Sequence, residues 1–253
     1  MKKGHFLAAL LGGVAMLTLA WLVLGGTATA LARPAADADS HTITLTPIRD
    51  NTLYESDLGT ISNGAGEFLF AGHTQKGEAR RALLAFDLSG IPAGSIVLSA
   101  TLTLTMSKSI AGDTAVGVHA LTADWGEAAS DALGEEGAGA LALPGDATWL
   151  HGFFDTDLWA TPGGDFAATA SAVTTVGGSG AYAWSSPALA ADVTAWLAGP
   201  AVNHGWVVVG DESAAGTAKR FDSRESAPVQ RPRLVVVYAE PVGVVFVPMV
   251  GKN

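Results

Sequence analysis

Charged side chains gather in one short stretch, KRFDSRES, of a chain that has few charges elsewhere. Lys219, Arg220, Asp222, Arg224 and Glu225 lie close together, whereas only 15% of the 253 residues are Asp, Glu, Lys or Arg. Carboxylates and guanidinium groups at this density can pair with one another, hold a ligand that carries a carboxylate, or coordinate a metal ion. This stretch is therefore the first candidate for a site.

In an extended strand alternate residues share a face, so Arg220, Asp222 and Arg224 line one side of the stretch. The pattern favours structural ion pairs that involve Arg220, Asp222, Arg224 and Glu225, either within the cluster or with the two acids of the preceding strand at 205–212. Two alternatives stay open. The Arg fork could bind a carboxylate such as a uronic acid of an anionic glycan, or Asp222 could ligate a metal.

A second group of oxygen-bearing residues suggests calcium. Asp50 and Glu55 precede the loop SNGAG, which contributes Asn63, and calcium takes six to eight oxygens from such groups. No linear EF-hand loop occurs, so a structural Ca²⁺ at Asp50, Glu55 and Asn63 would be assembled from separate loops. The alternative is a set of unrelated surface acids.

Aromatic residues in a Gly- and Asp-rich region provide the argument for sugar binding. Sugars present apolar C–H faces, which stack on exposed aromatic rings beside polar groups. Trp149, Phe154 and Trp159, with Asp155, are the predicted carbohydrate-binding residues. The alternative is that these rings pack the region onto a sheet.

The sequence gives little support for an enzyme. It has no Cys nucleophile, no G-x-S-x-G elbow and no His pair at metal-ligand spacing. Asp146, Asp155 and Asp165 would be the only candidates for a pair of hydrolytic acids, and nothing fixes their separation. We expect a chain without catalytic residues.

Composition and the N-terminus indicate an exported protein. Lys2 and Lys3 precede a long apolar run that ends in TATALA, which predicts a signal peptide over 1–32; an uncleaved anchor is the alternative. A flexible lead at 33–41 would follow. Acidic residues number 24 against 14 basic ones, a net charge of −10, which argues against nucleic acid. No later stretch is long and apolar enough to span a membrane, so we expect a secreted or cell-surface protein.

Hydrophobic periodicity predicts a chain of short strands and one helix. The alternating or apolar runs lie at 42–48, 67–72, 80–88, 96–107, 115–121, 205–212, 218–225 and 233–240. Pro187 and a helical repeat predict the helix at 187–200. An irregular insertion, rich in Gly and Trp, covers about 122–181. Together these features predict an all-β antiparallel sandwich of jelly-roll type over 42–240.

The last residues, 241–253, form an apolar tail, PVGVVFVPMVGKN. We expect the tail either to lie on a sheet edge of its own molecule or to pair with a neighbouring molecule. Self-association through a strand edge or through this tail is thus a further expectation.

The order of motifs resembles a known family. The segments NGAGEFLFAG, RRALLAFDLSGIPAGSIVLSATLTLTMS, HALTADWGE, GDATW, TPGGDF, DVTAWLAGPAVNHGWVVVGDES and AKRFDSRESAPVQRPRLVVVY follow one another as in the DNRLRE-domain proteins. These are secreted or surface proteins of bacteria and archaea, related to carbohydrate-binding modules of alginate-degrading enzymes. The chain has FDSRES where the namesake hexapeptide would stand. The resemblance implies a β-jelly roll, an extracellular setting and no catalytic role for the domain.

Two functions follow from these observations. The first is a non-catalytic secreted module that binds or organises extracellular polysaccharide, including anionic ones. The second is a structural cell-surface or matrix protein that works through protein–protein contacts. Sugar binding predicts exposed aromatic rings beside polar groups, whereas a structural protein predicts buried Trp residues.

Overall fold

A computed structural model describes residues 39–199 and 201–241 of the chain. The predicted signal segment, most of the predicted lead and the tail from residue 242 onward lie outside these residues. Ser40 already belongs to a strand, so the predicted lead at 33–41 ends before that residue. Within the described residues, no helix is long and apolar enough to cross a membrane.

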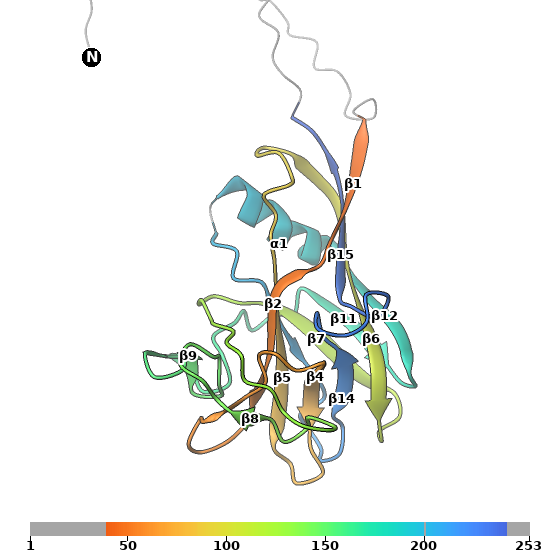
Figure 1. Cartoon of the computed structure of the whole chain (residues 1–253). Coiled ribbons are helices and arrows are strands. Elements are labelled where there is room, and N and C mark those ends of the chain that lie inside the picture. Colours follow the sequence, from red (N-terminus) through yellow and green to blue (C-terminus); the bar gives the residue numbers. More distant parts are fainter. Residues whose placement is uncertain (1–38, 200, 242–253) are drawn as a thin grey trace, which may run out of the picture. The chain divides into compact units, whose positions relative to one another are not determined.

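The described chain is mostly β-structure with one short helix (Figure 1). Its elements in chain order are β1 (Ser40–Leu45), β2 (Pro47–Tyr54), β3 (Ile61–Ser62), β4 (Phe68–His73), β5 (Ala79–Phe86), β6 (Ile96–Ser109), β7 (Thr114–Ala120), β8 (Ala140–Leu141), β9 (His151–Phe153), β10 (Asp157–Leu158), β11 (Ala172–Val176), β12 (Gly180–Ser185), α1 (Pro187–Ala198), β13 (Trp206–Val209), β14 (Lys219–Asp222) and β15 (Arg233–Ala239).

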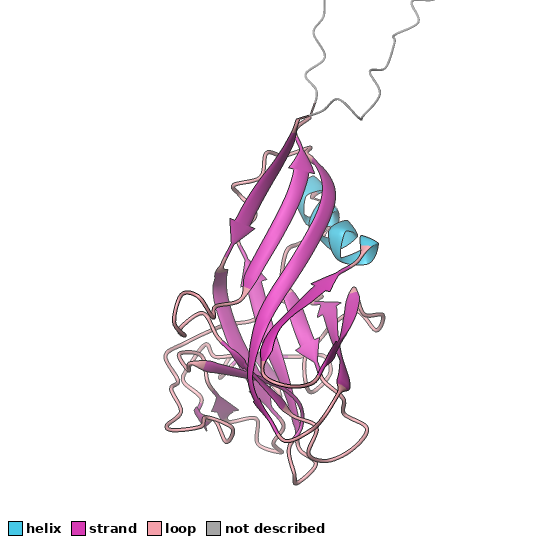
Figure 2. Ribbon diagram, turned by 90° about the vertical axis from the view of Figure 1, so that its right-hand side faces the viewer, coloured by secondary structure: helices cyan, strands magenta, loops and turns pink. Residues whose placement is uncertain are grey.

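One large antiparallel sheet of 11 strands dominates the fold, with its long strands side by side in Figure 2. The strand path is β1-β15-β6-β14-β4-β5-β13-β7-β11; β12 also pairs with β6, and β2 also pairs with β5. Leu102 and Trp184, from β6 and β12, share one core with Val118 and Trp206, from β7 and β13. The sheet must curl for strands so far apart in this path to share a core. The predicted mostly β, antiparallel architecture is confirmed.

Strand β6 shows why the alternation predicts the sheet. Ala100, Leu102 and Leu104 are buried in the main core, and the intervening Thr residues are half-buried on the other face. Leu98 keeps the same phase but is 55% exposed, because it lies near the strand end, where it lines a surface hollow against α1. The predicted alternation of buried and less buried residues along β6 is therefore correct, but the buried part of the strand begins at Ala100 and does not include Leu98.

The helix α1 begins and ends as its sequence predicts. Ser186 is the N-cap, and its hydroxyl accepts a hydrogen bond of 3.0 Å from the backbone N of Leu189. Pro187 occupies the first turn, and Gly199 ends the helix with φ of 80°. The buried side chains Leu189 and Val193 pack it on the main core.

Most of β2 and the whole of β3, β8, β9, β10, β11 and β12 were not predicted. β2 extends from Pro47 to Tyr54, whereas the expected strand ended at residue 48, because the polar run Asp50-Asn51-Thr52 conceals it; all three of these residues are buried. β11 lies inside the predicted insertion and pairs with β7. The irregular region therefore ends near residue 171 rather than 181, and residues 122–171 are called the excursion below.

The excursion covers the outer face of the sheet. Trp125, Trp149 and Trp159 of the excursion join a second core with Leu83 of β5 and Val207 of β13. Adjacent residues of β5 and β13 belong to the main core, so both faces of these two strands are buried. The excursion is an ordered layer.

A substitution at Gly205 would test how closely the backbone before β13 approaches β5. Its φ is 82°, and a Cβ atom at this position would lie 2.0 Å from the carbonyl oxygen of Leu84. We expect Gly205→Ala to lower the free energy of unfolding by more than about 3 kcal/mol. Gly77 has a similar φ of 84° with no atom nearby, so Gly77→Ala should cost only about 1 kcal/mol. Urea unfolding followed by Trp fluorescence measures both; equal costs would contradict the close approach.

Candidate functional site

Three carboxylates and one guanidinium meet beside the middle of β2. Asp50 lies in this strand and is 1% exposed. Glu127 comes from the excursion, and Arg224 and Glu225 come from the turn that follows β14. We call these four residues the acidic cluster. The turn after β14 contains the second part of the FDSRES stretch, so part of the predicted charge site does form a cluster.

Arg224 connects the members of the acidic cluster. Its backbone N donates to Asp50 Oδ2 at 2.8 Å, and its Nε and Nη2 donate to the two oxygens of Glu127 at 3.0 Å each. Nε also lies 3.1 Å from Glu225 Oε1. The backbone N of Asp50 donates to Glu127 Oε1 at 3.0 Å. The paired N–H donors of Arg224 and the backbone bonds fix the carboxylates.

Three acids with one base leave the cluster negatively charged. Burial is the largest cause that raises the pKa of Asp50 well above its ordinary value, and the charge of Glu225 adds to it, against the hydrogen bond from the Arg224 backbone. Burial also raises the pKa of Glu127, although the hydrogen bonds from Arg224 oppose this shift. The cluster therefore favours an additional positive species, either a proton or a metal cation.

A metal ion could be held by Asp50, Glu127 and Glu225. One carboxylate oxygen from each of them lies within 4.8 Å of the others. An all-oxygen set of this kind suits a hard cation such as Ca²⁺ or Mg²⁺. Both Glu127 oxygens already accept hydrogen bonds from Arg224, so a cation would share this carboxylate with the guanidinium.

The predicted calcium residues do not come together. Of the three, only Asp50 belongs to the acidic cluster. Glu55 is exposed just beyond the end of β2, where its carboxylate accepts a hydrogen bond from Ala79 N. Asn63 is buried and binds Ala132 N and Glu136 Oε2 at 2.8 Å each. The prediction treated 50–57 as loop, but a strand advances about 3.3 Å per residue, which separates Asp50 from Glu55.

The other charges of the FDSRES region have separate roles. Arg220 lies 3.7 Å above the ring of Phe68, and its Nη1 is 2.7 Å from Glu135 of the excursion. Asp222 is buried, makes no ion pair with any described residue, and its Oδ2 has no hydrogen-bond partner there. Burial raises its pKa. The predicted ion pair of Asp222 is therefore wrong.

The acids expected to pair with this strand do not do so. Glu212 makes two hydrogen bonds of 2.8 Å with Arg81 of β5, and Asp211 binds the backbone and hydroxyl of Ser213. Arg220 pairs instead with Glu135 and Arg224 with Glu127, both from the excursion, and Arg224 pairs also with its neighbour Glu225. No sequence pattern indicated where the excursion would lie.

The predicted sugar-binding rings are largely part of the second core. Trp149 is 9% exposed and Trp159 is 6% exposed, so neither presents a ring face to solvent. Trp159 Nε1 donates to the carbonyl of Thr148 at 2.9 Å. Phe154 is half-buried, and Asp155 is an exposed turn residue with φ of 70°. The expected exposed platform of Trp149 and Trp159 is absent, because the outer face of the sheet needs these rings as cover.

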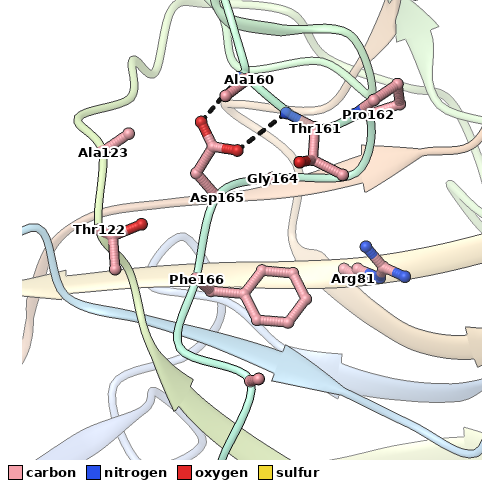
Figure 3. Close-up of a pocket in the computed structure, with 10 residues that line it drawn as sticks. Arg81, Thr122, Ala123, Ala160, Thr161, Pro162, Gly164, Asp165 and Phe166 are labelled. Atoms are coloured by element: carbon pink, nitrogen blue, oxygen red, sulfur yellow. Dashed lines mark hydrogen bonds between the residues drawn. The ribbon is translucent and has the colours of Figure 1, made fainter.

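A surface hollow lies at the rim of the second core (Figure 3). It has a volume of about 600 Å³, and Phe166, Asp165, Thr161, Thr122 and Arg81 are among its lining residues. In Figure 3 the Phe166 ring lies beside the Arg81 guanidinium, and Arg81 Cζ is 5.3 Å from the ring centroid. We call this space the Phe166 hollow. It combines a half-exposed ring with hydroxyl and carboxylate groups.

Local hydrogen bonds hold the polar groups of the Phe166 hollow. The Asp165 carboxylate accepts from the backbone N of Ala160 at 2.8 Å and of Thr161 at 2.9 Å. The guanidinium of Arg81 is bound to Glu212 and to the carbonyl of Gly163. The hollow is therefore preformed, but its only arginine is already neutralised.

Sequence reasoning missed Glu127 and Phe166. Both lie in the excursion, where no period indicates which side chains turn inward. Glu127 follows WG directly, and Phe166 follows an Asp that caps its own turn, but neither pattern is specific. Lys219 was predicted only as part of the charge cluster; it is fully buried and donates to the carbonyls of Ala111 and Gly112.

Comparison with known proteins gave no match to a family model and none to a curated protein.

The raised pKa values of the acidic cluster predict how stability varies with pH. In the presence of chelator the folded state binds protons at Asp50 more tightly than the unfolded chain does. The contribution of Asp50 to the free energy of unfolding should therefore be largest near pH 4 and fall as the pH rises toward neutrality. We expect Asp50→Asn to remove this decline and to stabilise the protein at pH 7 by about 1 kcal/mol or more.

Urea unfolding between pH 4 and pH 8 measures this effect, with Asp57→Asn, an exposed acid near the end of β2, as the control. A decline that is unchanged in Asp50→Asn would contradict the assignment.

Proposed function

We propose that this chain is a secreted, non-catalytic module that binds extracellular polysaccharide through the Phe166 hollow. The observation that carries this proposal is the half-exposed Phe166 ring beside the polar side chains of Thr122, Thr161 and Asp165. Sugar rings stack their C–H faces on aromatic rings, while their hydroxyl groups bond to carboxylates and hydroxyls. The finer fold assignment, a jelly roll of the DNRLRE-domain type, belongs to this proposal; the curled antiparallel sheet and the order of the sequence motifs support it.

The roles of the acids support binding without catalysis. Asp146 is buried, and its oxygens accept hydrogen bonds from the backbone N of Ala128 and of Leu143. Asp165 likewise holds two backbone N–H groups. Hydrolysis of a glycosidic bond would need two carboxyl groups free to act on opposite sides of that bond. These two carboxylates have a structural task instead.

Calcium bound by the acidic cluster is a second part of the proposal. Asp50, Glu127 and Glu225 would supply carboxylate oxygens, and water would complete the coordination. The bound ion would offset the excess negative charge and hold the excursion, through Glu127, against β2 and the turn after β14. Calcium would therefore have a structural role, away from the Phe166 hollow.

A structural surface protein is the second candidate function. Five tryptophans of the described chain are buried, as this function predicts: Trp125, Trp149, Trp159, Trp184 and Trp206. Strand β1 ends the strand path and pairs only with β15 among the described strands. Its sequence, SHTITL, has no Lys or Pro to prevent a further strand from adding. Contact between copies through β1 would suit such a protein.

Glycan binding tests the main proposal. The mature protein should bind at least one polymer in a panel of neutral and uronic-acid polysaccharides, measured by affinity electrophoresis and calorimetry. Phe166→Leu, which keeps apolar volume but removes the ring, should weaken binding about tenfold. Phe154→Leu is the matched control, because Phe154 is also a half-buried ring of the excursion but does not line the hollow.

Equal losses in the two variants would reject the Phe166 hollow as the site. Absence of binding to every polymer would reject the proposal and favour the structural protein.

Thermal unfolding with and without Ca²⁺ tests the acidic cluster. At a Ca²⁺ concentration about 100 times its Kd, the free energy of unfolding should rise by about 2.7 kcal/mol. Asp50→Asn and Glu225→Gln should remove most of this gain. Glu55→Gln should keep it, since Glu55 lies outside the cluster; loss of the gain in Glu55→Gln alone would restore the set expected from the sequence.

A further inference from the structure

A second hollow adjoins the Phe166 hollow. It has a volume of about 350 Å³, and its lining includes Trp196 and Asp192 of α1, His204 and Thr122. Thr122 also lines the Phe166 hollow, so this exposed residue borders both spaces. We call the second space the Trp196 hollow.

Trp196 differs from the other tryptophans of the described chain. It is half-buried, whereas the other five are buried. Its ring lies against the buried ring of Trp206, with ring centroids 4.6 Å apart, and this contact on its inner side fixes its orientation. A ring held on one side and open on the other suits stacking against a sugar.

Polar groups surround the Trp196 ring. The Asp192 carboxylate, fixed by a 2.8 Å hydrogen bond from Trp206 Nε1, lines the hollow with the imidazole of His204. His204 Nδ1 is 3.6 Å from Asp124 Oδ1. Carboxylate, imidazole and the Thr122 hydroxyl can each exchange hydrogen bonds with sugar hydroxyl groups.

The charges around both hollows select the kind of sugar. Arg81 is neutralised by Glu212, and Arg49 pairs with Asp124 beside His204. The carboxylates that line the hollows, Asp165 and Asp192, make no ion pair with a described residue, which leaves the lining negative. A uronic acid would bring further negative charge without finding a free arginine, whereas a neutral sugar has no such cost.

We propose that the Phe166 and Trp196 hollows form one extended site for a neutral glycan chain. One sugar ring stacks on Trp196, the chain crosses Thr122, and a further sugar lies in the Phe166 hollow. This inference rests on the proposed glycan binding and adds a second aromatic contact and the charge class of the ligand. It narrows the expected ligands, which included anionic polysaccharides, to neutral ones.

Binding and quenching measurements on the mature protein test this site. The probes are a soluble neutral β-glucan, a galactomannan and a polyuronate, each titrated by calorimetry. A neutral polymer should bind at least about tenfold more tightly than the polyuronate. It should also protect Trp fluorescence from acrylamide, because Trp196 is the one tryptophan of the described residues that is not buried. Trp196→Leu should lose this protection and about tenfold in affinity. Thr194→Val, an exposed residue of the same helix that does not line the Trp196 hollow, should change neither.

Two further variants keep the test decisive if Trp196→Leu does not fold. Ala201 is exposed and lines the Trp196 hollow, so Ala201→Gln should obstruct it without disturbing the core. Asp192→Asn retains an acceptor for Trp206 and should raise the affinity for the polyuronate. Asp157→Asn, an exposed residue of the excursion that lines neither hollow, should not.

The outcomes separate this inference from the proposed function. Neutral-glycan binding that depends on Phe166 but not on Trp196 or Ala201 would overturn the extended site and leave the Phe166 hollow in place. Tighter binding of the polyuronate would overturn the charge class. Absence of binding to all three polymers would overturn the extended site and would also reject these three polymers as ligands of the Phe166 hollow.

Discussion

The need to bury both faces of β5 and β13 determines much of this structure. Leu84 and Val208 face the main core, whereas Leu83 and Val207 face outward. A sheet with apolar residues on both faces must be covered on both, and burial of each large aliphatic side chain contributes about 1.5–3 kcal/mol. The curl of the sheet covers one face, and the excursion covers the other. The long connection after β7 is thus a required layer of the fold.

This requirement explains where the aromatic residues lie. The excursion has few aliphatic side chains of its own at the contact, so Trp125, Trp149 and Trp159 supply the apolar surface. Rings used as core cannot also stack on a ligand. The rings that keep an open side are therefore at the rim, where the cover ends: Phe166 at one margin of the second core and Trp196 where α1 meets β13. The sequence prediction chose Trp149 and Trp159 because aromatic residues are frequent around them, and these lie in the middle of the excursion layer. It missed Phe166 and Trp196, which lie at the edge of that layer.

The sequence was sufficient for the helix and most of the longer strands, and insufficient for β2, β11 and β12 and for the clusters. Alternation over 96–107 predicted β6, and Pro187 with a helical repeat predicted α1, since these signals depend on neighbours close in the chain. The apolar runs ALLAF and WVVV predicted β5 and β13 as strands, but not that both of their faces are buried. The acidic cluster joins residues 77, 97 and 174 positions apart. No local pattern encodes such a meeting, and the polar run that begins at Asp50 appeared to be a loop until the sheet gave it a partner strand.

The arginines show why an acidic chain can still use cations structurally. Arg49 lies 4.5 Å from the ring of Trp125, Arg81 lies 4.8 Å from Trp149, and Arg220 lies 3.7 Å from Phe68. Each of these guanidinium groups also pairs with an acid, and two of the three acids come from the excursion. Arginine can serve both contacts at once because its planar group stacks on a ring and binds a carboxylate at its edge.

These positive charges hold the excursion and the sheet together and leave carboxylates in the majority around the open hollows. A surface of this composition repels anions, and its remaining affinity must come from ring faces and hydrogen bonds. The packing of the second core thereby limits the chemistry available at its rim, and a neutral, hydroxyl-rich ligand is the kind that this chemistry accommodates.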